Sequence, residues 1–111
     1  MSNLNKKSCE ACSIDAPQAT QEETIGFMSQ LSDWQIIELD GIKRLNRVFK
    51  FNNFVDALSF TGRVGALAES ENHHPALLTE WGKVTVSWWT HKIKGLHVND
   101  FVMAAKTDTI A

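Results

Sequence analysis

The sequence predicts an α+β fold in which a four-stranded antiparallel sheet carries helices on one face, in the order α-β-β-α-β-β-α. Apolar residues recur with helical spacing in some segments and alternate with polar residues in others. Turn signals at Asp40-Gly41 and at Gly82 join the alternating segments into two hairpins. A chain of 111 residues can bury one core, so we expect a single domain at residues 18–111 behind a flexible N-terminal arm at residues 1–17.

The polar arm ends at Pro17, and its one chemical signal is a C-x-x-C pair, Cys9 and Cys12. A structural zinc site normally needs four ligands, and no second Cys or His pair stands at finger-like spacing. A thioredoxin-like motif would follow a strand and open a helix, and this arm does neither. We therefore interpret the two cysteines as a reduced, non-essential pair.

Each of the three expected helices begins near a residue that can cap it. We place them at about residues 20–32, at 53–71, and from about residue 99 onward. Thr20 and Glu23 form a capping-box pattern, Asn52 or Asn53 can cap the second helix, and Asn99 or Asp100 can cap the third. The first helix carries its apolar residues near one stripe: Ile25, Phe27, Met28 and Leu31.

The second helix contains two glycines, Gly62 and Gly65, among small alanines. Glycine in a helix interior costs about 1 kcal/mol relative to alanine. We therefore expect a sheet or another helix to approach closely at these positions.

The strands are expected at about residues 34–39, 42–51, 77–81 and 83–91. Alternation in the second strand predicts a core face made of Leu45, Phe49 and Phe51. In the fourth strand, one face holds Val84, Val86 and Trp88, and the other holds Thr85, Ser87, Trp89 and His91. A sheet of this kind has open edges and a bare face, which favour self-association.

Composition and charge exclude several classes of function. The formal net charge is −2, so the chain lacks the basic field that nucleic-acid binding by charge requires. No apolar run approaches the roughly 20 residues of a membrane helix, and the polar N-terminus does not resemble a signal peptide. We expect a cytoplasmic protein with neither a membrane nor a nucleic acid as its direct partner.

The stretch from Glu69 to Asp100 carries the clearest chemical signal, because it contains His73, His74 and His91. Imidazole, with an unperturbed pKa of roughly 6.5, exchanges protons near neutrality. Glu69 and His73 are four residues apart, so one helix face can present both. The proline after His74 should end the helix there, and Asp100 can orient an imidazole or cap a helix. The pattern suggests proton-transfer chemistry.

Each of these histidines also has a structural interpretation. A His-His pair in a loop is often solvated, and a histidine that closes a strand, such as His91, is often a satisfied structural residue. A metal centre is a third interpretation, but H-E-x-x-H is absent and the adjacent pair His73 and His74 would converge poorly on one ion. We therefore expect no metal. The tryptophans are core or interface residues by default.

Seven positions in this stretch follow the order Glu-x3-His-His-Pro-x5-Trp-x9-His-x8-Asp, occupied by Glu69, His73, His74, Pro75, Trp81, His91 and Asp100. This run resembles the signature of the pterin-4a-carbinolamine dehydratases. The resemblance covers about residues 17–111, and the C-x-x-C arm resembles bacterial members only. Trp81 stands where tyrosine is common, and Trp89 stands where animal members tend to have serine, so substrate preference is less constrained than reaction type.

The resemblance implies loss of water from 4a-hydroxytetrahydropterin to give the quinonoid dihydropterin, which recycles the cofactor of aromatic amino acid hydroxylases. It implies no cofactor, and assembly as a homodimer or homotetramer. The implied catalytic residues are His73 and His91 for proton transfer and His74 for holding the pterin. The implied substrate-binding or orienting residues are Glu69, Asn72, Trp89, Thr90, Lys92, Asp100 and Trp34.

The alternative function is that of a protein-binding module. Animal relatives in the resembled family also act as dimerisation cofactors for a homeodomain transcription factor. The bacterial features of this chain fit that role poorly, so partnership with a hydroxylase, or an effect on its expression, is the second role that we consider.

Overall fold

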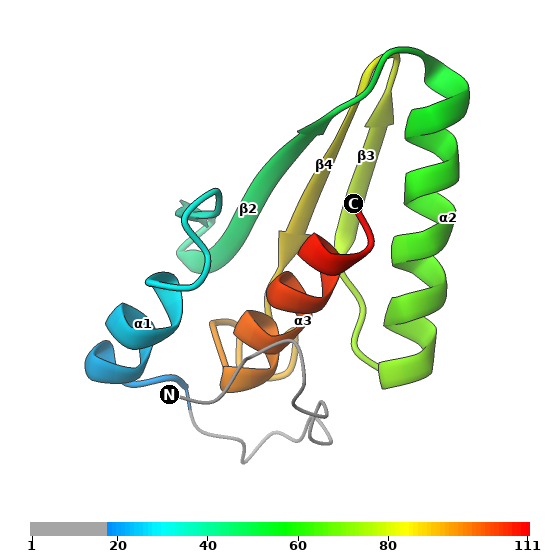
Figure 1. Cartoon of the computed structure of the whole chain (residues 1–111). Helices are drawn as coiled ribbons and strands as arrows, with labels where there is room; N and C mark the ends of the chain where they lie inside the picture. Colours follow the sequence, from blue (N-terminus) through cyan, green and yellow to red (C-terminus); the bar gives the residue numbers. More distant parts are fainter. Residues whose placement is uncertain (1–17) are drawn as a thin grey trace.

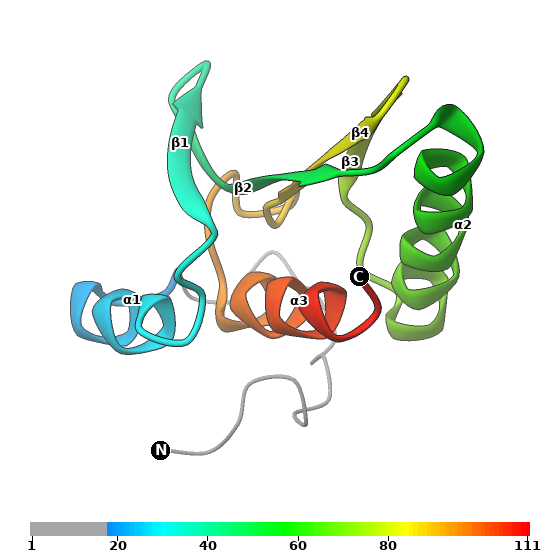
Figure 2. The same cartoon turned by 45° about the horizontal axis from the view of Figure 1, so that its top comes forward.

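The computed structural model describes residues 18–111, which form a four-stranded antiparallel sheet with three helices against one face (Figures 1 and 2). The elements are α1 (Gln21–Met28), β1 (Gln35–Leu39), β2 (Ile42–Lys50), α2 (Phe54–Glu71), β3 (Ala76–Glu80), β4 (Lys83–Trp88) and α3 (Val98–Thr109). The expected fold class and element order are therefore confirmed. The expected arm at residues 1–17 and its cysteine pair lie outside the described residues.

The sheet has the order β1-β2-β4-β3, so that β1 and β3 are its edges. Asp40 and Gly41 join β1 to β2 with positive φ angles of 54° and 78°. Such angles suit a two-residue hairpin turn, because their twist matches that of the flanking strands. In the centre of the sheet, Leu45 of β2 lies opposite Trp88 of β4. This register places the buried apolar residues of both strands on the same face of the sheet. Figure 2 shows that the three helices lie on one side of the sheet.

The core lies between this face and the helices. From the strands it receives Leu45, Phe49, Val84, Val86 and Trp88, as the alternation predicts. From α2 it receives residues at helical spacing, namely Ala57, Phe60, Val64 and Ala68. Each large apolar side chain that is fully buried contributes about 1.5–3 kcal/mol to stability. The core thereby holds the carboxyl ends of α2 and β4 near each other.

The helix starts confirm two predicted caps and correct the third. Thr20 caps α1 in a capping box, and the Asn53 side chain accepts a 2.7 Å hydrogen bond from the backbone of Asp56. The prediction that Asn99 or Asp100 caps α3 is wrong, because His97 is the cap. Its Nδ1 accepts from the backbone of Asn99 at 3.0 Å, so α3 begins one residue earlier.

Two expectations about exposed surfaces also change. Ile25 of α1 is exposed rather than packed with the rest of its stripe. A Cβ added at Gly62 or Gly65 would meet no atom within 4 Å, so neither the sheet nor another helix of the described chain approaches α2 there. Val55 and Leu58 of the same helix are also exposed. The two glycines therefore face outward with apolar neighbours.

A polar contact ties β2 to the end of α3. Asp108 accepts hydrogen bonds from Trp34 Nε1 at 2.8 Å and from Arg47 Nη1 at 2.7 Å. Burial raises the pKa of the Asp108 carboxyl above its ordinary value, although the Trp34 hydrogen bond and the Arg47 charge lower it.

Within residues 18–111, no helix combines the length and apolar character that crossing a membrane requires.

Candidate active site

The site is built where α2 ends and the chain turns into β3. Asn72 takes the left-handed conformation, with φ 52° and ψ 41°, and its N–H donates to the carbonyl oxygens of Ala68 and Glu69. Asparagine tolerates this conformation better than most residues. The helix ends at Glu71, as its expected range of 53–71 has it, but its regularity breaks at Asn72 rather than at His74. His73 and His74 therefore lie in the connection before β3.

His73 is the most constrained of the three candidate histidines. Its side chain is only 3% exposed, and its Nε2 lies 2.6 Å from Asp100 Oδ1. The ring also stacks on Trp88, with centroids 5.8 Å apart and an interplanar angle of 8°. Its backbone N–H donates to the Ala68 carbonyl at 3.1 Å. These contacts hold the position and the orientation of the imidazole.

Asp100 gathers three donors around a carboxyl group that is completely buried. Besides His73, it accepts from Thr90 Oγ1 at 2.8 Å and from the backbone N–H of His97 at 2.9 Å. An ionised carboxylate can only accept hydrogen bonds, so the His73 proton in this pair belongs on Nε2. Asp100 thus contacts the His73 imidazole, as expected, but it is the third residue of α3 in the capping box of His97 rather than the cap itself.

His74 and Glu69 form a second, exposed pair. His74 Nε2 lies 2.5 Å from Glu69 Oε1, and both side chains are largely in solvent. The four-residue spacing predicts that Glu69 shares a face with His73, but its partner is the next histidine. The left-handed turn at Asn72 explains the difference, because it ends the helical spacing before His73 is reached.

His91 is exposed and opens the turn that follows β4. Its ring stacks on that of Trp89, with centroids 4.5 Å apart and an interplanar angle of 27°. The backbone carbonyl of His91 accepts from Lys94 at 3.3 Å. Unlike the other two, this imidazole has no carboxylate against it within the described part of the chain.

All three candidate histidines meet at one cavity of about 470 Å³, which is lined by Asn72, His73, His74, His91 and Lys92. Glu69 contacts the lining of the cavity through His74, and Asp100 contacts it through His73. Thr90 and Trp89 do not line the cavity. Thr90 donates a hydrogen bond to Asp100, and Trp89 stacks on His91. Trp34 is placed elsewhere, in the core beside Asp108, so it does not belong to this cavity.

The fourth histidine, His97, also belongs to the surroundings of the site, although it is not among the residues that the sequence predicts there. His97 is buried, its Nδ1 caps α3, and its backbone N–H donates to Asp100. His97 therefore helps to hold Asp100 in place, and Asp100 in turn contacts His73. Its spacing of three residues before an aspartate was the available signal, because that is the capping-box spacing.

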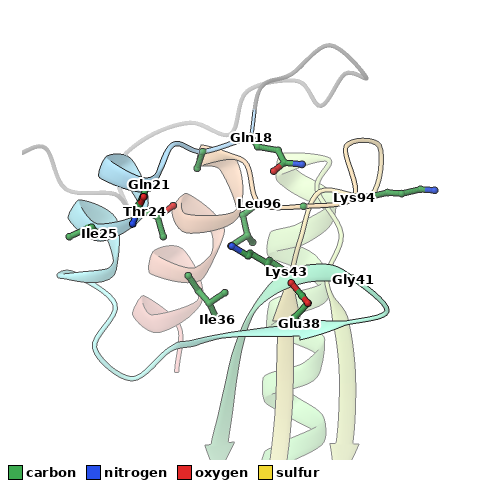
Figure 3. Close-up of a pocket in the computed structure, with 12 residues that line it drawn as sticks. Gln18, Gln21, Thr24, Ile25, Ile36, Glu38, Gly41, Lys43, Lys94 and Leu96 are labelled. Carbon is green, nitrogen blue, oxygen red and sulfur yellow. The ribbon is translucent and has the colours of Figure 1, made fainter.

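A second and larger cavity, of about 630 Å³, lies between α1 and the β1–β2 hairpin (Figure 3). Lys43 extends into it, whereas Lys94 points away into solvent (Figure 3). Glu38 is the cross-strand partner of Lys43 on its wall. No histidine lines this cavity, so size alone does not identify the chemical site. Among residues 18–111, no group of three His, Cys, Asp or Glu side chains is arranged to hold a metal ion.

Comparison with known proteins gives consistent matches over almost the whole chain. A family model described as pterin 4 alpha carbinolamine dehydratase matches residues 17–110. A relative from Syntrophotalea carbinolica, named for the same activity, is 61% identical over 99% of this chain and 98% of its own length. A similarly named relative from Nitrosococcus oceani is 57% identical over 99% of this chain and 97% of its own length.

A solved structure resembles the fold as well as the sequence. It is described as a transcriptional coactivator/pterin dehydratase from Brucella melitensis, and it covers 86% of this chain and 99% of its own. The sequences are 32% identical, and the TM-score is 0.76. The residues that the family model matches, 17–110, include all those that line the histidine cavity.

Proposed function

The chain belongs to the pterin-4-alpha-carbinolamine dehydratase family, and we propose that it removes water from a 4a-hydroxytetrahydropterin by histidine acid–base catalysis. The observation that supports this mechanism is the convergence of His73, His74 and His91 on one cavity. These imidazoles come from two connections that are well separated in the sequence. Family and cavity point to the same reaction.

The reaction needs one proton donor and one proton acceptor. The C4a–O bond breaks as an imidazolium protonates the departing hydroxyl, which leaves as water. A neutral imidazole takes the N5 proton, and the N5 electron pair forms the C4a=N5 bond of the quinonoid dihydropterin. Atoms and charges balance without an oxidant. Such acid–base catalysis typically contributes 10²–10⁴-fold to the rate.

The surroundings of each imidazole suit a division of roles. His73 is paired with the buried Asp100 carboxylate, which stabilises a positive charge on the ring and suits the donor. His91 has no such carboxylate within the described residues, which suits the acceptor. His74 and Glu69 stand at the exposed rim, where they can hold the polar edge of the pterin.

Single alanine substitutions test the assignment. His73→Ala and His91→Ala should each lower kcat by about 10²–10⁴-fold, because each removes one partner in proton transfer. His74→Ala is the matched control, since loss of a holding residue should mainly raise KM. Stopped-flow measurement of carbinolamine dehydration distinguishes these effects. A folded His73→Ala protein with full turnover would contradict the mechanism.

We also propose that this activity recycles the pterin cofactor of an aromatic amino acid hydroxylase in the cytoplasm. The support is the family, since the product is the oxidised form that a reductase returns to the tetrahydropterin. In a coupled reaction, added protein should prevent the carbinolamine from accumulating during hydroxylation. Accumulation at the same rate with and without the protein would argue against this role.

The outer face of α2 supports a homodimer or homotetramer. Val55 is 73% exposed, Leu58 is exposed, and Gly62 and Gly65 leave room for a close neighbour. Small residues allow helix backbones to pack closely, which would offset the cost of two glycines in a helix interior. We propose a second copy of the chain as that neighbour. Sedimentation velocity should show a species of at least twice the monomer mass.

The same helix face supports the alternative function of a protein-binding module. The Brucella melitensis neighbour is described as a coactivator as well as a dehydratase. If binding were the main role, a partner should copurify in stoichiometric amount, and the His73→Ala protein should retain it. If catalysis is the main role, that substitution should abolish the function of the protein in cells.

A further inference from the structure

The side chains of Arg44, in β2, and Trp89, which directly follows β4, meet on the face of the sheet opposite the three helices of the described chain. The guanidinium carbon of Arg44 lies 4.0 Å from the centre of the Trp89 ring. The Trp89 ring is also stacked on the imidazole of His91, at 4.5 Å. We call this unit the Arg44–Trp89–His91 stack. It is continuous with the histidine cavity, because His91 is one of the lining residues.

The register of the sheet explains why the stack forms. Leu45 pairs with Trp88, so the residues before and after them, Arg44 and Trp89, come opposite each other and point to the open face. Trp88 points to the helix face, where it stacks on His73. Two consecutive tryptophans therefore contact one candidate proton-transfer residue each, on opposite sides of the sheet.

His91 depends on this contact more than His73 does. His73 is held by the Asp100 carboxylate and by burial. Within residues 18–111, the side chain of His91 makes no hydrogen bond, and the Trp89 ring is its one aromatic contact. Stacking engages the face of the imidazole, so both nitrogens at the ring edge stay available for proton exchange. The stack can thus orient the ring without occupying its reactive atoms.

Arg44 shows that Trp89 is itself held in place. Arg44 Nε is buried and has no hydrogen-bond partner among the described residues. An arginine in such a place commits its planar cation to the aromatic ring rather than to an acceptor. We propose that Arg44 and Trp89 are positioning residues, which hold the His91 imidazole at the angle that proton transfer requires.

This inference rests on the proposed role of His91, and it gives Trp89 a function different from substrate contact. Trp89 does not line the cavity, so its removal should lower kcat and leave KM nearly unchanged. A misplaced catalytic group can cost about 100-fold in rate, and we expect a loss of about 10- to 100-fold for Trp89→Ala. Trp89→Phe keeps a stacking ring and should restore most of the rate.

The test combines kinetics with proton NMR of the full chain. The Trp89 ring current should shift the His91 ring protons upfield in the unmodified protein and in Trp89→Phe, but not in Trp89→Ala. Arg44→Met should give an intermediate shift and rate, because it keeps the aliphatic bulk without the cation. Trp81→Ala is the matched control, since Trp81 is 73% exposed in the β3–β4 turn and should change neither quantity.

The outcomes separate this inference from the proposed function. An inactive His91→Ala together with a fully active Trp89→Ala, or with unchanged His91 signals in Trp89→Ala, would overturn the positioning role alone. Equal losses in Trp89→Phe and Trp89→Ala would also overturn it. A fully active His91→Ala would instead remove the catalytic role of His91, on which the inference depends.

Discussion

Asp100→Asn perturbs the site with almost no change in shape. Asp100 is completely buried and accepts three hydrogen bonds, from His73, Thr90 and the backbone of His97. Asparagine has one oxygen and one NH₂ group, so it can keep the two contacts on one side and must present a donor to His73. The His73 ring would then have to accept on Nε2, which moves its own proton to Nδ1.

The structure allows the size of the effect to be worked out. The hydrogen bond from His73 to the buried Asp100 carboxylate is lost, which costs about 1.5–3 kcal/mol. For a domain of this size, each 1 kcal/mol lowers Tm by about 4–8 °C, so we expect a fall of roughly 6–24 °C. With Nε2 accepting from the asparagine, the ring cannot become the doubly protonated imidazolium that protonates the departing hydroxyl, so kcat should fall by about 10²–10⁴-fold.

Thermal unfolding by circular dichroism and stopped-flow dehydration kinetics measure the two effects on one protein sample. Asp33→Asn is the control, because Asp33 is exposed and its change should stay within about 0.5 kcal/mol. An Asp100→Asn protein with an unchanged Tm and full turnover would refute the reasoning. A fall in Tm with full turnover would show that Asp100 serves the fold but not His73.

Three further predictions concern stability, packing and assembly. Because burial raises the Asp108 pKa in the folded state, the stability it contributes is present below its unfolded pKa and is lost as pH rises through the folded value. Urea unfolding from pH 3.5 to 6.5 should therefore show the unmodified chain losing stability relative to Asp108→Asn, and the opposite slope would mean that the Arg47 pair dominates. Phe60→Ala should lower the unfolding free energy by about 3–5 kcal/mol, since Phe60 is fully buried against Phe49, and a loss below about 1 kcal/mol would contradict that packing. Gly62→Leu should dissociate the assembly in sedimentation velocity without unfolding the chain, whereas an unchanged oligomer would show that α2 faces solvent.

The fold could be predicted largely because its signals are local. The Asp40-Gly41 turn has the backbone that its residues favour, and strand alternation assigned Leu45 and Phe49 to the core correctly. The start of α3 could not be predicted as well. Asn99 and Asp100 are both good caps by residue type, but the capping acceptor is an imidazole nitrogen of His97. Contacts from Thr90 and His73 draw Asp100 into another role, and these depend on the tertiary structure.

The residues of the site could be predicted better than the pairs they form. A spacing of four residues predicts that Glu69 accompanies His73, but Asn72 ends the helix with a left-handed turn between them. Glu69 then meets His74, and the partner of His73 comes from α3, 27 residues away. Local periodicity carries no information about a contact of that range. The family resemblance supplied the candidate set, whereas the pairing within it depends on packing.

The two adjacent tryptophans show how the alternation of side chains along a strand sets the positions of the imidazoles in the site. Side chains alternate across a strand, so Trp88 and Trp89 must point to opposite faces of the sheet. One reaches the buried imidazole of His73, and the other reaches the exposed imidazole of His91. A shift of one residue in the pairing of β4 would exchange both faces and separate both stacks. The register that buries Val84 and Val86 therefore also sets the positions of the two imidazoles, which is why core substitutions in β4 should affect turnover as well as stability.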